Sequence, residues 1–97
     1  MKINKTENGS ELLIAVVGRL DTTTSPQLDE ELKSLNGIEK LVFDFKELEY
    51  ISSAGLRVLL SAQKVMNKQG SMIVKNVSEE ISEIFEVTGF VDILTIE

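Results

Sequence analysis

The hydrophobic residues at the start of this chain fall in two short runs separated by the pair Asn8-Gly9. The first run covers residues 1–7, and the second, from Glu11 to Val17, is strongly apolar. An Asn-Gly pair favours a tight turn between two antiparallel strands. The pattern therefore predicts that the chain opens with a β-hairpin.

A change to helical spacing follows the hairpin. Ser25-Pro26 suits a helix start, because serine is a favoured N-cap and proline fits the first helical position. One face of the predicted helix carries Leu28, Leu32 and Leu35, and Asn36-Gly37 can end it. The nearly continuous apolar run at residues 40–45 then predicts a central strand covered on both faces.

The clearest amphipathic pattern begins near Ala54 and ends at Gly70. A helix over this segment would bury a stripe made of Val58, Leu59, Ala62, Val65 and Met66. Its opposite face would be wet and would carry Arg57, Ser61, Lys64 and Lys68. We therefore expect a long helix that lays one face on the sheet.

The remaining sequence predicts two more strands around a third helix. Residues 71–75 have a strand pattern, and a short last strand is expected at residues 92–96. Between them, Ser78 suits an N-cap and Gly89 a helix end, and the inner face of this helix would hold Ile81, Ile84 and Phe85.

The predicted order of elements is β-β-α-β-α-β-α-β. Strands that alternate with helices imply right-handed parallel crossovers. We therefore expect one α/β domain over residues 1–97, with a mixed, mostly parallel β-sheet, an N-terminal β-hairpin and about three to four helices. In such sheets the functional crevice lies beyond the carboxyl ends of the strands. Two loops belong to that edge: Asp21 to Ser25 after the second strand, and Tyr50 to Gly55 after the third.

Composition narrows the chemistry available to the chain. With 97 residues, 42% of them hydrophobic, it fits one domain with one modest core. It has no cysteine and no histidine, which excludes thiol and imidazole catalysis, zinc sites of the usual type and disulfides. Asp21 and Asp44 are two lone carboxylates, a weak signal for a metal site, and Asp44 is expected to have a structural role. No metal, cofactor or conventional acid–base enzyme is predicted.

Charge and hydropathy bear on the partners. The net charge is −6 and the ten basic residues are scattered, which argues against nucleic acid. The amino-terminal segment Met1-Lys2-Ile3-Asn4-Lys5 is polar overall, and the apolar run from Leu12 to Val17 is too short for a signal peptide or a membrane span. We therefore expect a cytoplasmic protein that binds neither nucleic acid nor membranes.

The candidate chemistry lies at Ser52 and Ser53, where the chain changes from strand to helix. A helix start has backbone N–H groups without intrahelical partners and partial positive charge, so a hydroxyl there lies beside an anion site. The alternative for Ser53 is a structural N-cap. Asp21 could help to hold the neighbouring loop or contact a basic residue of a partner, or it could cap an Asx-type turn. Gly55 would allow close approach of a partner or of a strand.

Three segments closely resemble the STAS domain: Gly18-Arg19-Leu20-Asp21, Leu41-Val42-Phe43-Asp44-Phe45, and the run from Tyr50-Ile51-Ser52-Ser53-Ala54-Gly55 to Leu60. The resemblance extends over nearly the whole chain. A free-standing domain of this length is similar to the bacterial anti-sigma factor antagonists. The resemblance implies a protein that binds an anti-sigma serine kinase when unphosphorylated and is released when the kinase, using ATP, phosphorylates one serine. A serine phosphatase then resets the cycle.

Aligned on Gly55, the family's phosphorylated serine corresponds to Ser53, with Ser52 as the alternative hydroxyl. The better-studied members commonly have Asp at the position of Ser52 and Ser or Thr at that of Ala54. The resemblance implies a partner-binding surface made of Asp21, Thr22, Thr23, Thr24, Ser52, Ser53, Ala54, Gly55 and Arg57. The protein itself is expected to be a monomer or a weak dimer and not an enzyme.

Two other functions remain open on the sequence. One is a non-switching STAS adaptor, a subunit of a transporter ATPase or of a signalling scaffold, which would dock through the same surface permanently. The other is a small phosphotransfer enzyme or hydrolase that uses Asp21, Asp44 and a bound cation. No G-x-x-x-x-G-K-[ST] phosphate loop is present, so nucleotide binding by the chain itself is not predicted.

Overall fold

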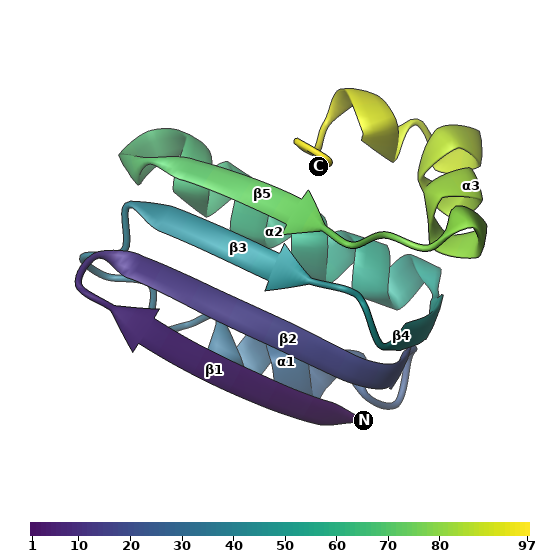
Figure 1. Ribbon diagram of the computed structural model, residues 1–97, viewed down its shortest axis with the longest axis horizontal. Coiled ribbons are helices and arrows are strands. Elements are labelled where there is room, and N and C mark those ends of the chain that lie inside the picture. Colours follow the sequence, from purple (N-terminus) through teal and green to yellow (C-terminus); the bar gives the residue numbers. More distant parts are fainter.

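Five strands form one mixed sheet, and two helices cover one of its faces (Figure 1). The computed structural model describes all residues from Met1 to Glu97. In chain order the elements are β1 (Lys2–Asn8), β2 (Glu11–Leu20), α1 (Ser25–Glu31), β3 (Lys40–Asp44), β4 (Leu48–Ile51), α2 (Ser53–Gln69), β5 (Ser71–Lys75), α3 (Glu79–Thr88) and the 3-10 turn η1 (Phe90–Asp92). The predicted α/β class, the opening hairpin and the mostly parallel sheet are confirmed.

The long strand β2 organises the sheet. It pairs antiparallel with β1, then parallel with β3 along residues 11–15 and with β4 along residues 18–20. The register shifts between Gly18 and Arg19, and Gly18 has a φ of +99°, a conformation that glycine adopts without steric cost. This bend lets one strand serve two neighbours and brings the end of β4 beside the end of β2.

The hairpin turn lies one residue later than the sequence predicts. Asn8 still pairs with Glu11, so Gly9 and Ser10 form the two-residue loop in place of Asn8-Gly9. Gly9 has a φ of +63° at the first loop position. Hairpin turns of the type that puts glycine first need this conformation.

The first helix is shorter than predicted. Its N-cap is Thr24 rather than Ser25, and it ends at Glu31 rather than at Asn36-Gly37. The hydroxyl of Ser25 instead donates to the backbone oxygen of Asp21, inside the protein. Leu28 and Leu35 are buried as expected, although Leu35 lies beyond the helix.

The structure has one strand that was not predicted and lacks one that was. The segment before α2 contains a separate strand, β4, which the sequence analysis treated as a polar turn followed by Tyr50-Ile51. The last strand expected at residues 92–96 is wrong, because η1 occupies residues 90–92 and only an isolated parallel bridge joins Ile96 to Val74.

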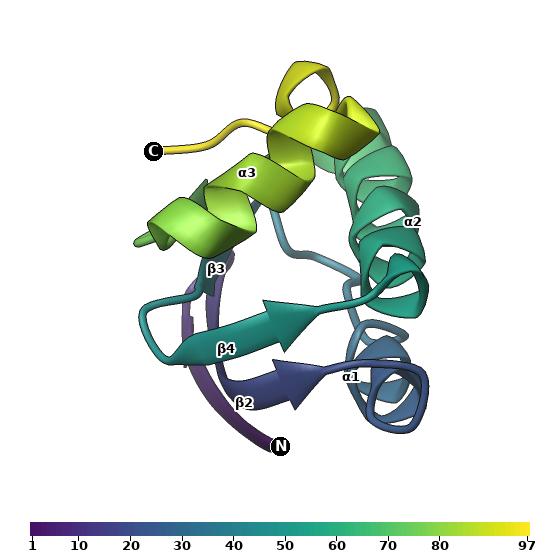
Figure 2. The same cartoon turned by 90° about the vertical axis from the view of Figure 1, so that its right-hand side faces the viewer.

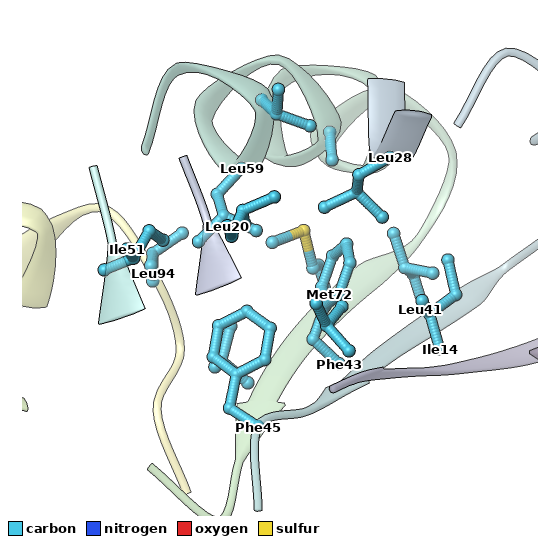
Figure 3. Packing of buried hydrophobic residues seen from close by; sticks show 14 of the residues in the cluster. Ile14, Leu20, Leu28, Leu41, Phe43, Phe45, Ile51, Leu59, Met72 and Leu94 are labelled. Carbon is cyan, nitrogen blue, oxygen red and sulfur yellow. The ribbon is translucent and has the colours of Figure 1, made fainter. Parts of the chain in front are cut away.

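The core lies between the sheet and α2, as Figure 3 shows for Leu59, Phe43 and Met72. One cluster of 22 buried hydrophobic residues spans all the strands from β2 to β5 and the three α-helices, so the chain has a single core. The prediction that Val65 belongs to the buried stripe of α2 is wrong, because this residue is 40% exposed. Gln63, which was not predicted to be buried, is. Val65 borders a hollow toward the segment after α1, which ends too early to cover it.

The predicted limits of the third helix are confirmed. The side chain of Ser78 accepts a hydrogen bond from the backbone N–H of Ile81, and Gly89 ends the helix with a left-handed φ of +81°. Ile81 and Phe85 are buried, and Ile84 is half-buried. No helix of the structure combines the length and the apolar character that crossing a membrane requires.

Candidate functional site

The start of α2 lies where two parallel strands end side by side. β2 leads into the loop before α1, and β4 leads into α2 at the same edge of the sheet (Figure 2). The backbone N–H of Ser52 donates to the oxygen of Leu20 at 2.9 Å, which ties the two chain segments together. The loop expected after the third strand therefore follows β4, and it does reach the edge that was predicted for it.

The two serines at this junction differ in exposure. Ser53 is the first residue of α2 and its side chain lies at the surface. Ser52 occupies the N-cap position, but its hydroxyl oxygen has less than 1 Å² of exposed surface and no hydrogen-bond partner. The alternative role of Ser53 as a structural N-cap is therefore wrong, because the residue at the N-cap position is Ser52.

Arg57 follows Ser53 by one helical turn and lies on the wet face, as predicted. Its Nε donates to the backbone oxygen of Ser53 at 3.4 Å, and its Nη2 lies 3.5 Å from the Ser53 hydroxyl oxygen. A guanidinium group thus reaches the one exposed serine hydroxyl of this junction.

Asp21 holds the loop before α1 in an Asx-type turn, the structural alternative of the sequence analysis. Its Oδ1 accepts from the backbone N–H groups of Thr23 at 3.0 Å and Thr24 at 3.1 Å. The backbone hydrogen bond from Thr24, with that from Thr23 and the nearby charge of Arg19, holds the pKa of Asp21 below its usual value. The loop is therefore shaped by a carboxylate that stays ionised, and it leaves Thr22 and Thr23 exposed.

Gly55 is buried against the end of the sheet. A Cβ at this position would lie 2.8 Å from both Ile51 Cγ1 and Leu20 Cγ, and 3.0 Å from the Leu20 oxygen. The close approach predicted for Gly55 is thus an approach to the two strands, and it sets α2 directly onto the ends of β2 and β4.

A shallow groove of about 300 Å³ runs between α1 and α2 beside the junction. Residues from the loop before α1 and from both helices line it: Thr22, Ser25, Pro26, Asp29, Ala54, Arg57, Val58 and Ser61. Arg57 is the only basic residue in this set. The groove joins two parts of the predicted partner-binding surface, the loop at residues 22–24 and the first turn of α2.

Asp44 has the structural role predicted for it. Its Oδ1 accepts from the Asn76 side-chain amide at 2.9 Å and from the Lys46 backbone N–H at 3.0 Å. The Asn76 hydrogen bond is the main reason that the pKa of Asp44 lies below its usual value. No group of three or more His, Cys, Asp or Glu side chains is placed to hold a metal ion.

The contact between Arg19 and Tyr50 beside the site was not predicted from the sequence. The Arg19 guanidinium lies 4.5 Å from the centre of the Tyr50 ring, and its Nε is 3.7 Å from Asp21 Oδ2. Stacking of this kind is favourable because the face of an aromatic ring attracts a cation. The signal was the pairing of Arg19 with Tyr50 across β2 and β4, which cannot be seen without knowing that β4 exists.

The family model of the STAS domain matches residues 2–97. The chain belongs to the STAS domain family. This STAS domain is 32% identical over 99 residues to BtrV of Bordetella bronchiseptica, a match that covers 99% of this chain and 85% of that protein. It is 30% identical over 99 residues to the anti-sigma-B factor antagonist of Bacillus subtilis, covering 99% of this chain and 90% of that protein.

Solved structures agree on the fold of the STAS domain. SpoIIAA, an anti-sigma factor antagonist, has been solved unphosphorylated, and SpoIIAA as a Bacillus cell fate determinant has been solved phosphorylated. Each superimposes with a TM-score of 0.78 over 99% of this chain, covering 87% and 91% of the SpoIIAA chains, at 15% and 16% identity. The resemblance predicted from the sequence motifs is confirmed.

Proposed function

We propose that this STAS domain is an anti-sigma factor antagonist that switches partners through Ser53. In the unmodified form it binds an anti-sigma serine kinase, and phosphorylation of Ser53 releases it. A serine phosphatase returns it to the binding form. The names of its relatives, which include an anti-sigma-B factor antagonist, support the regulatory class.

The observation that carries the proposal is the difference between the two hydroxyls at the start of α2. Ser53 presents its hydroxyl at the surface, whereas the Ser52 hydroxyl is sealed and out of reach of a kinase. This favours Ser53 over Ser52 as the acceptor. SpoIIAA, a protein of the same fold, occurs in both phosphorylated and unphosphorylated forms, which is consistent with a phosphorylation switch in this fold.

The chemical step needs little from this chain. The Ser53 oxygen attacks the γ-phosphorus of ATP held by the kinase, the new O–P bond forms, and the bond from that phosphorus to the β–γ bridging oxygen breaks, so that ADP leaves. The hydroxyl proton passes to a general base of the kinase. The protein is thus the substrate and the ligand of its partner, and the catalytic groups belong to the kinase.

Phosphorylation acts on a docking surface and leaves the fold intact. The proposed surface joins Ser53, Ala54 and Arg57 with the loop at residues 21–24, across the groove between α1 and α2. A phosphate adds about −1.5 to −2 charge and three acceptor oxygens. At the start of α2 this charge is tolerated by the helix, but it has to be desolvated when a partner covers the surface.

The test is binding to the cognate anti-sigma serine kinase, measured by calorimetry. Ser53→Ala should bind about as well as wild type, whereas Ser53→Asp should bind at least about tenfold more weakly, or ~1.4 kcal/mol, because it places a charge in the interface. Intact mass after incubation with kinase and ATP should rise by one phosphate in wild type and in Ser52→Ala, but not in Ser53→Ala.

Two results would contradict the switch. Unchanged kinase binding by Ser53→Asp would show that charge at this position does not control docking. Constant binding with no phosphate on any serine would favour the non-switching adaptor. Because Ser52→Ala keeps the acceptor and changes only the neighbouring residue, it serves as the matched control.

A further inference from the structure

Arg57 is a cation without an acidic partner, placed beside the proposed phosphoacceptor. The ion pairs of the structure join Lys5 to Glu31, Arg19 to Asp21, Lys33 to Glu30 and Lys40 to Glu11, and none includes Arg57. Its guanidinium instead reaches the backbone and hydroxyl oxygens of Ser53, at 3.4 and 3.5 Å. These are long contacts to neutral groups, so the cation has capacity left for a stronger acceptor.

The spacing of the two residues suits a phosphate. Positions i and i+4 are neighbours on a helix surface, and Arg57 follows Ser53 by four residues within α2. A guanidinium group presents its N–H donors in a planar fork that matches the oxygens of a phosphate. A phosphate on the Ser53 oxygen would therefore lie within reach of Arg57 without any change of backbone.

The surrounding charges leave this pairing to Arg57 alone. The groove beside it contains one other charged residue, Asp29 of α1, and the preceding loop contributes Asp21. Both are carboxylates and would repel a phosphate, and Asp21 already accepts hydrogen bonds within its own loop. Tyr50 and Arg19 on the adjoining strands are occupied with each other.

We infer that Arg57 clamps the phosphate of phosphorylated Ser53 within α2. The inference rests on the proposed function in taking Ser53 as the modified residue. The clamp has a second effect on the docking surface, because it withdraws the guanidinium from any partner that would otherwise bind it. Phosphorylation then changes two residues of the surface, adding a negative charge at Ser53 and neutralising the positive charge of Arg57.

The test uses protein that carries phosphoserine at position 53, inserted during translation, so that no kinase is needed. The second ionisation of the phosphate is followed by phosphorus NMR as a function of pH in wild type, Arg57→Gln, Arg57→Lys and Lys64→Gln. Lys64 is an exposed basic residue on the same wet face, two turns further along α2, and serves as the matched control.

An ion pair stabilises the dianion, so the phosphate pKa should be lower in wild type than in Arg57→Gln by about 0.3 to 0.7 of a unit. Arg57→Lys should recover part of the shift, and Lys64→Gln should match wild type. The Arg57 Nε resonance should also move when the phosphate ionises. Equal phosphate pKa values in wild type and Arg57→Gln would overturn the clamp.

The outcomes separate this inference from the proposed function. If the kinase modifies Ser53 but Arg57→Gln does not change the phosphate pKa, the switch stands and the clamp is wrong. If the pKa shift is present but the kinase neither binds nor modifies the protein, the pairing exists and the partner-switching function is wrong. A merely structural role of Arg57 would alter the unfolding of the protein without changing the ionisation of the phosphate.

Discussion

Asp44 and Asp21 each hold a turn through an ionised carboxylate. Asp44 joins the end of β3 to Asn76 after β5, and Asn76 has a φ of +58°, an uncommon conformation for a residue other than glycine. The Asp44 hydrogen bond thus holds Asn76 in this left-handed conformation at the carboxyl end of the sheet. Asp21 likewise fixes the loop that borders the proposed docking surface, because it accepts hydrogen bonds from two backbone N–H groups of that loop.

The lowered pKa of Asp44 has a consequence for acid stability. Because the folded state favours its ionised form, this carboxylate stabilises the protein above its unfolded-state pKa of about 3.9 and ceases to do so as the pH falls through its lower folded-state pKa. Asp44→Asn should lose about 0.5–1.5 kcal/mol of unfolding free energy at neutral pH and show a weaker fall of stability in acid.

Urea unfolding between pH 7 and pH 2 would measure this effect. Glu49→Gln, which changes an exposed carboxylate of β4 that makes no hydrogen bond, is the control. A pH dependence in Asp44→Asn as steep as in wild type would show that Asp44 is not a source of the acid sensitivity.

The two longer helices begin in different ways. In α3 the side chain of Ser78 caps the helix by accepting from the N–H of Ile81, at 3.2 Å. In α2 the residue at the same position, Ser52, makes no such bond and keeps a buried, unpaired hydroxyl. The start of α2 is held instead by the packing of Gly55 on Leu20 and Ile51, which leaves the first turn free of a capping side chain.

This difference predicts opposite responses to the same substitution. Ser78→Ala should destabilise the protein by about 1 kcal/mol, because it removes a cap. Ser52→Ala should leave stability unchanged or raise it, because it removes a buried polar group that has no partner. Thermal and urea unfolding would compare them, and equal losses would mean that Ser52 does cap α2 in solution.

The proposed docking surface occupies one end of the sheet, so the anti-sigma serine kinase proposed as its partner should protect that end alone. Hydrogen exchange measured with and without the kinase should slow at residues 21–25 and 52–57. It should not change at Gly9-Ser10 or at Gly70, which lie at the opposite end of the strands (Figure 1). Protection of the hairpin turn instead would place the interface elsewhere on the molecule.

Local patterns predicted most of the fold because local bonds determine those parts. Ser78 and Gly89 limit α3 through their own cap geometry, and β5 covers residues 71–75 as predicted. The strand β4 was missed because it has only four residues and is defined by its pairing with β2 rather than by its own pattern. Because β4 was not predicted, the contact of Arg19 on β2 with Tyr50 on β4 was not predicted either.

The site was predictable in position but not in detail. The rule that function gathers at the carboxyl ends of parallel strands brought Asp21 and Ser53 to one edge, which the pairing of β2 with β4 confirms. Which serine is exposed depends on the path of one turn, and so does the burial of Gly55. Neither can be read from residue types alone.

The outer strands β1 and β5 differ in whether their free backbone side is covered. Beside β5, the backbone of Thr95 and Glu97 bonds to Val74, so the tail of the chain occupies part of that border. β1 has no neighbour on its outer side, and lysines at positions 2 and 5 stand along it. Of these two strands, only β1 can add a strand of another copy, and its charged residues are of both signs: Lys2, Glu7 and Lys5, which already pairs with Glu31. A second copy that pairs with β1 would use the free outer strand of both molecules, so the sheet would end at the pair and would not extend into a fibre.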